Sequence, residues 1–179
     1  MTTHSEVVAF WRDAGAARWF ARDHAFDAEF HRCFETAHFA AARRELESWM
    51  ESAEGALALL ILLDQFPRNC FRGSAHSYAT DGLAKHYARQ AVAAGFDLEI
   101  DRGLRLFFYL PFEHSETLAD QDRSMGLFGG IGDAELIKYA QLHRDLIERF
   151  GRFPHRNAAL GRESTREEID YLASGGFSG

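Results

Sequence analysis

Residues 54–66 read EGALALLILLDQF and contain Ala56–Leu63, the longest unbroken apolar run of the chain. A helix that is apolar around its whole circumference is buried, so this segment is predicted to be the central helix of a bundle. Its start is expected at Ser52 or Ala53. The apolar run is far shorter than the roughly 20 residues that a helix needs to span a bilayer, so no membrane segment is expected.

The segments that flank this helix also carry apolar residues at helical spacing. Asp27 is expected to cap one of them, Ser115 to cap a second, and Asp133 to cap a third that ends at Phe150. A last helix is expected to start at Ser164 or Thr165. The glycines between 126 and 132 are expected to open the chain into a turn. No alternating strand pattern is found, so the sequence predicts an all-α fold of about seven to nine helices packed antiparallel.

Length and composition narrow the class of protein further. With 179 residues, one domain over residues 1–179 is expected, with residues 172–179 as a flexible tail. A net charge of −7 argues against a general binder of nucleic acid or anionic membranes. Cys33 and Cys70 form no disulfide framework and no leader segment is recognisable, which favours a cytoplasmic protein.

One phrase occurs twice in the chain. LLDQFPRNCFRG at residues 62–73 and RFGRFPHRNAALGR at residues 149–162 each place Pro after Phe and continue into Arg-Asn or His-Arg-Asn. Proline lacks an N–H donor, so Pro67, Pro111 and Pro154 are each expected to end a helix. If the three helices ran in the same direction, the polar residues after the prolines would gather in one cleft.

This hypothesis defines a set of candidate site residues. The proposed proton-transfer groups are His143, His114, Glu116 and Asp64. The proposed ligand-binding groups are Arg68, Asn69, Arg72, Arg152, His155, Arg156, Asn157, Arg162, Asp120 and Gln121. Asp64 ends the apolar run and needs a cationic partner, for which Arg68 and Arg72 are candidates. A purely structural ion pair for Asp64, a core role for His143 and a solvated helix start around Glu116 remain alternatives.

Three long stretches carry a resemblance to a known family. They are LLDQFPRNCFRGSAHSYATD (62–81), FYLPFEHSETLADQDRS (108–124) and HRDLIERFGRFPHRNAALGRES (143–164). They resemble the bacterial domain-of-unknown-function family number 924 over essentially the whole chain. The resemblance implies an all-helical, tetratricopeptide-like arrangement of helix pairs. It implies no reaction and no cofactor, and it includes the candidate residues above.

Two functions remain open from the sequence. The first is binding of a small anion, such as a phosphorylated or carboxylated metabolite, with or without its conversion. Paired N–H donors of arginine would hold the anion, and an inward histidine would act as general acid or base. The second is a helical scaffold for a peptide or protein, in which the polar motifs only lock helix ends. Whether the protein is an enzyme stays undecided.

Two further classes receive less support. His114, Glu116, Asp120, His143 and His155 could supply metal ligands, but their spacing matches no established metal motif, so no metal site is assigned. RNA binding would rest on the arginines of residues 144–166, but a charged helix face and tail is the favoured explanation of that run. No phosphate loop or dinucleotide fingerprint is present.

Overall fold

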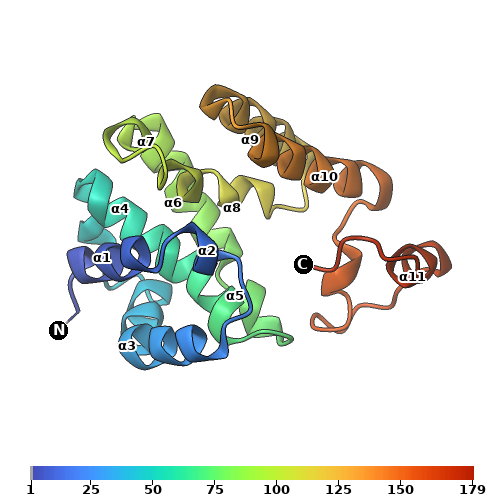
Figure 1. The fold of residues 1–179 in the computed structure, drawn as a ribbon, viewed down its shortest axis with the longest axis horizontal. Coiled ribbons are helices and arrows are strands. Elements are labelled where there is room, and N and C mark those ends of the chain that lie inside the picture. The colour runs from blue at the N-terminus through green and yellow to red at the C-terminus, as the bar shows by residue number, and fades with distance from the viewer. Residues whose placement is uncertain (1) are drawn as a thin grey trace. The chain divides into compact units, whose positions relative to one another are not determined.

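The computed structural model describes residues 2–179, and within them the chain is all-helical, without a strand (Figure 1). This confirms the predicted fold class. The elements are α1 (His4–Ala14), α2 (Ala16–Trp19), α3 (His24–Ala42), η1 (Glu47–Glu51), α4 (Ala53–Leu60), η2 (Ile61–Gln65), α5 (Phe66–Cys70), η3 (Ala75–Tyr78), α6 (Asp81–Ala93), α7 (Phe96–Glu99), η4 (Arg105–Phe108), α8 (Leu110–Glu113), α9 (Leu118–Ile131), α10 (Ala134–Phe150), η5 (Pro154–Arg156) and α11 (Arg166–Ala173).

The chain forms two compact units. The first contains Met1–Arg72 and His76–Pro111, and the second contains Gly73–Ala75 and Phe112–Gly179. A single domain over the full length therefore stays a prediction. The cleft predicted to join the two similar stretches also stays a prediction, because residues 62–73 lie mainly in the first unit and residues 149–162 lie in the second. Among the described residues, no helix has both the length and the apolar character needed to cross a membrane.

The first unit is built around the predicted central helix. Ser52 accepts a hydrogen bond from the backbone N–H of Gly55, which caps α4 as expected. The helix then continues without a break through η2 and α5 to Cys70, and every residue from Gly55 to Pro67 is buried. Helices α1, α3 and α6 pack against this rod (Figure 1). The prediction of a buried central helix is confirmed.

Pro67 does not end this helix, and the prediction that it would was wrong. The five residues before α5 form a π-helical turn, in which the N–H of Phe66 donates to the carbonyl of Ile61. Pro67 lies in the first turn of α5 and has no backbone N–H. In a π-helical turn that N–H would donate to the carbonyl of Leu62, and in an α-helical turn to the carbonyl of Leu63. Both carbonyls therefore lack this donor.

Side chains from elsewhere in the first unit supply the missing donors. The Nδ1 atom of His38 lies 2.8 Å from the carbonyl oxygen of Leu62, and the hydroxyl of Thr80 donates to the carbonyl of Leu63. Because buried carbonyls without a donor are costly, these bonds explain how a proline is accommodated within a continuous helix.

The other two prolines also open helical segments instead of ending them. Pro111 is the second residue of α8, and Pro154 is the first residue of η5. The first helical positions have no intrahelical partner for their N–H, so a proline there loses nothing. Helix α10 is instead ended by Gly151, whose φ of 70° is left-handed. The prediction of three proline-terminated helices was therefore wrong.

The second unit contains a helical hairpin of α9 and α10 (Figure 1). Asp133 caps α10, which spans Ala134–Phe150 as predicted. The expected loose turn at the glycines was wrong, because α9 continues through Gly126, Gly129 and Gly130 to Ile131. Only Gly132, with φ of 74°, forms the turn.

A small apolar core stabilises the rest of the second unit. Leu146 and Ile147 of α10 and Phe153 are buried together, and Phe150, Tyr171 and Phe177 pack against them. Phe177 belongs to the segment for which flexibility was expected, and that flexibility stays a prediction. Thr165 caps α11 with a full capping box, at one of the two predicted starts.

Candidate functional site

The candidate residues of the first unit form an ion-pair network on the central helix. Asp64 is 1% exposed, and its Oδ1 lies 3.1 Å from Nη1 of Arg68. Arg68 also donates to the backbone carbonyl of Asp64 at 2.8 Å and holds Asp81 through two bonds of 2.8 and 2.9 Å. Arg68 is thus the cationic partner that was expected for Asp64, and the two carboxylates raise the pKa of its guanidinium.

Arg72 and Asn69 have different surroundings. Arg72 donates from Nε to Asp27 at 3.2 Å. Asp27 therefore does not cap α3, because Asp23 accepts from the N–H groups of Ala25 and Phe26 and begins that helix one turn earlier. Asn69 is buried, and its Nδ2 has no hydrogen-bond partner among the described residues.

In the second unit, Arg152 and Asn157 are tied to one carboxylate. Arg152 forms a fork with Glu168 at 2.7 and 2.8 Å, and Asn157 donates to the same side chain at 3.2 Å. Glu168 is 2% exposed, and the Arg152 guanidinium lowers the pKa of this carboxyl to about 2. These two candidate residues hold α11 in place, which is a structural role.

Glu116 and Arg162 form a second lock. Arg162 donates from its two terminal nitrogens to Glu116 at 2.8 and 3.0 Å, and the backbone N–H of Phe153 donates to the same carboxylate at 2.8 Å. These bonds hold the pKa of Glu116 below its usual value in spite of burial. The Glu116 carboxylate is ionised, and both of its oxygens accept hydrogen bonds from Arg162 or Phe153. This arrangement does not support the predicted part of Glu116 in proton transfer.

Asp120 and Gln121 organise the start of α9. Asp120 accepts from the hydroxyls of Ser115 at 2.7 Å and Thr117 at 2.8 Å, while Gln121 donates to the carbonyls of Glu113 and Ser115. The N-cap residue is Thr117 and not Ser115, which was the expected cap. Both predicted ligand groups therefore stabilise the turn that leads into the hairpin.

His143 lies in the interior of the second unit, as its position on the apolar stripe of α10 predicts. Its Nδ1 is 2.8 Å from the carbonyl oxygen of Tyr139 and 3.4 Å from Oε1 of Glu113. A carbonyl oxygen only accepts, so Nδ1 carries the hydrogen. Burial lowers the pKa of His143 to about 3, and the neutral ring therefore keeps an acceptor lone pair on Nε2.

Further basic side chains surround the fully buried ring of Phe153. The ring of His143 meets it edge-on at 5.5 Å, the ring of His155 lies at 5.6 Å, and the guanidinium carbon of Arg156 lies 4.5 Å from its centroid. The ring of His114 lies 6.3 Å from that of His143. We call His114, His143, His155 and Arg156 the histidine cluster. In addition to burial, the other three members of the cluster lower the pKa of His143.

Two groups that matter to these sites were missed by the sequence analysis. Glu113 is 4% exposed and its Oε1 lies 3.4 Å from Nδ1 of His143, whereas the sequence pattern pointed to the neighbouring His114. In the first unit, Nε2 of His38 lies 3.0 Å from Nε2 of His76, and His38 stacks on Phe66 at 4.8 Å. Nothing in the local sequence signals that pair. The described residues contain no group of three or more His, Cys, Asp or Glu side chains arranged to hold a metal ion.

Comparison with known families gives a match over residues 7–176 to a family model described as "Bacterial protein of unknown function (DUF924)". The chain belongs to the DUF924 family. This DUF924 protein is also similar to a solved structure of a protein of unknown function from Agrobacterium tumefaciens. The two are 53% identical, with 96% of this chain and 97% of the other covered and a TM-score of 0.93. A search of curated proteins gives no match.

Proposed function

We propose that this DUF924 protein binds a small anionic molecule, such as a phosphorylated or carboxylated metabolite, at the histidine cluster of its second unit. The observation that carries the proposal is the gathering of two imidazoles and one guanidinium around Phe153, with a third imidazole, that of His114, beside His143. Arginine binds carboxylate and phosphate through paired N–H donors, and imidazoles add donors when they are protonated.

The electrostatics of the cluster support an anion over a cation. Arg156 is 5% exposed, so its charge acts in a medium of low effective dielectric constant. The same charge helps to keep His143 neutral, because a second buried cation beside it is unfavourable. A bound anion beside His143 would act in the opposite direction and would raise the pKa of this imidazole.

Under this proposal the members of the cluster have separate roles. Arg156 would hold the anion, while His114 and His155 would donate to it. His143 donates its only hydrogen to Tyr139, so its Nε2 is available only as an acceptor. It would therefore receive a hydrogen bond or a proton from the ligand, and any turnover would use it as a base. The predicted role of Asp64 in such chemistry is not part of this proposal, since it lies in the other unit.

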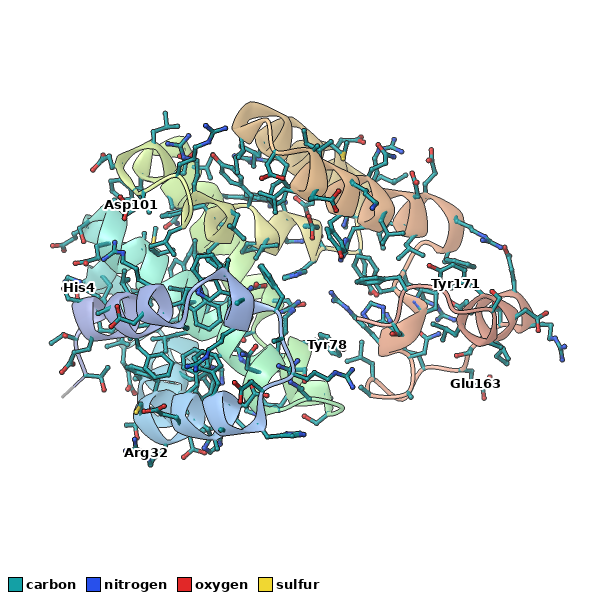
Figure 2. All side chains as sticks on the ribbon, viewed as in Figure 1. His4, Arg32, Tyr78, Asp101, Glu163 and Tyr171 are labelled. Carbon is teal, nitrogen blue, oxygen red and sulfur yellow. The ribbon has the colours of Figure 1, made fainter. Side chains whose placement is uncertain are left out.

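Inorganic phosphate is the probe for a direct test. We expect the imidazole NMR signals of His114, His143 and His155 to shift saturably with phosphate, and Arg156→Lys to weaken the apparent affinity about tenfold or more. Arg32→Ala is the matched control, because Arg32 projects from α3 with a side chain that is 74% exposed (Figure 2). Absence of any saturable shift with phosphate or with small carboxylates would refute the proposal.

The scaffold alternative also has a structural observation in its favour. Several predicted binding residues, namely Arg152, Asn157, Arg162, Asp120 and Gln121, are used to lock helix ends and turns. Under this alternative, phosphate leaves all three imidazole signals unchanged. Arg156→Lys would then alter only the melting temperature of the protein.

A further inference from the structure

Residues Gly175–Gly179 leave the end of α11 by a defined route. The N–H of Gly176 donates to the carbonyl of Tyr171 at 3.1 Å, and the N–H of Gly175 donates to the carbonyl of Leu172 at 3.2 Å. This pair of bonds is a Schellman motif, with Gly175 in the left-handed conformation at φ of 84°. The motif reverses the chain and directs it back along its own helix.

Tyr171 holds the returning segment at two points. Its hydroxyl accepts a hydrogen bond of 2.8 Å from the backbone N–H of Phe177. Its ring lies so close to Gly176 that a Cβ at that position would fall 2.5 Å from ring atoms, so only glycine fits without displacement of the segment. Tyr171 itself projects from α11 (Figure 2) and packs on Phe150 at 5.2 Å.

The segment places an aromatic ring on the histidine cluster. The ring of Phe177 meets His143 at 4.8 Å and His155 at 5.3 Å, in both cases edge-on. A Cβ at Gly179 would lie 3.1 Å from Cδ2 of His155, so the backbone at residue 179 also lies against this imidazole. Two of the four cluster residues are therefore covered by a segment outside any helix.

We propose that residues 175–179 form a strap that closes over His143 and His155 and has to move aside before an anion can reach them. The inference deepens the proposed function and rests on it for the identity of the ligand. Phe177 is only half-buried, and one hydrogen bond joins its backbone N–H to Tyr171. Segments with few buried contacts open at low free energy while the helices below them remain folded.

Exchange of the imidazole Cε1 hydrogens with deuterium measures access to each ring without any ligand. Rates are compared by mass spectrometry at alkaline pH, where the imidazoles are neutral. We expect Phe177→Ala and Gly176→Ala to raise the exchange rate at His143 and His155 about tenfold. This corresponds to a loss of roughly 1.4 kcal/mol in the free energy of strap closure. Gly129→Ala is the control, since a Cβ there meets nothing within 4 Å.

The possible outcomes distinguish a failure of the strap proposal from a failure of the proposed anion site. His38 in the first unit serves as the internal reference, and an equal rise there would indicate general unfolding and overturn the strap. Unchanged exchange at His143 and His155 in both variants would overturn it as well. If exchange rises as expected but inorganic phosphate gives the Phe177→Ala rings no protection, the strap stands and the proposed anion site fails.

Discussion

Thr80 donates its hydroxyl to the carbonyl oxygen of Leu63, which lies four residues before Pro67. In an uninterrupted α-helix the N–H of residue 67 would make this bond. A residue at the start of α6 has therefore replaced a backbone donor of the central helix. The cost of an interior proline, about 3 kcal/mol or more, is offset in part by a side chain from another helix.

This relationship predicts a coupling between two positions. Thr80→Val keeps the shape of the side chain but leaves the buried Leu63 carbonyl without its donor, so the free energy of unfolding should fall by about 1–3 kcal/mol. In a Pro67→Ala background the restored N–H can take over, and the same substitution should cost less. Urea unfolding of the two single variants and the double variant measures the coupling, and Thr80→Ser is the control that keeps the hydroxyl. Strictly additive effects would contradict this explanation.

Two glycines of α9 offer a second test. Gly129 and Gly130 lie inside the helix, and a Cβ at either position meets nothing within 4 Å. Gly129→Ala and Gly130→Ala should each stabilise the protein by about 0.4–1 kcal/mol, because alanine loses less backbone entropy on folding. Gly132→Ala should destabilise it, since φ there is 74°. Thermal unfolding of the three variants checks the sign, and a stabilising Gly132→Ala would contradict the helix boundary.

The pH dependence of stability should carry the signature of buried imidazoles. The pKa of His143 is about 3 in the folded protein and 6.5 when exposed, so between these values the unfolded chain holds the extra proton. The free energy of unfolding should therefore fall as the pH drops from 6.5 toward 3, with a slope from this group of roughly 1 kcal/mol per pH unit. Burial also lowers the pKa of His38, which acts in the same direction.

His143→Asn tests this assignment. The amide Nδ2 can replace Nδ1 as donor to the Tyr139 carbonyl, but it does not titrate in this range. The variant should be less sensitive to acid than the wild type between pH 6.5 and 4, measured by denaturant unfolding at a series of pH values. An unchanged slope would show that His143 is not held neutral.

The lock between Arg152 and Glu168 predicts a separate effect at lower pH. The pKa of Glu168 is lowered to about 2, so its contribution is complete above pH 4.5 and is lost as the pH falls from 4.5 toward 2. Arg152→Gln should raise that pKa, move the acid-unfolding midpoint upward and lower the melting temperature. Arg149→Gln is the comparison, because its Glu167 partner is exposed. Equal effects of the two substitutions would contradict a special role for Glu168.

Features decided by neighbouring residues were predictable from the sequence. Ser52, Asp133 and Thr165 cap their helices as expected, because a cap depends only on side-chain and backbone groups within one turn. The buried central helix was predictable from its apolar composition. The prediction that Pro67 ends this helix was wrong, because the donors that accommodate the proline come from His38 and Thr80, which are distant in sequence.

The candidate site was predicted only in part. The inward direction of His143 follows from the stripe of α10, and the Asp64–Arg68 pair follows from the need to neutralise a buried carboxylate. Which arginines are engaged in structural pairs depends on tertiary partners such as Glu168. The place of Glu113 behind His143 also depends on packing between segments thirty residues apart.

The contact between His38 and His76 limits how many hydrogens these two rings can share. His38 already commits Nδ1–H to Leu62, so only one hydrogen can occupy the 3.0 Å gap between the Nε2 atoms. A hydrogen on each Nε2 would place two N–H groups head to head. The two rings would then have to separate, which would move His76 away from His38 and from the central helix that His38 contacts at Leu62.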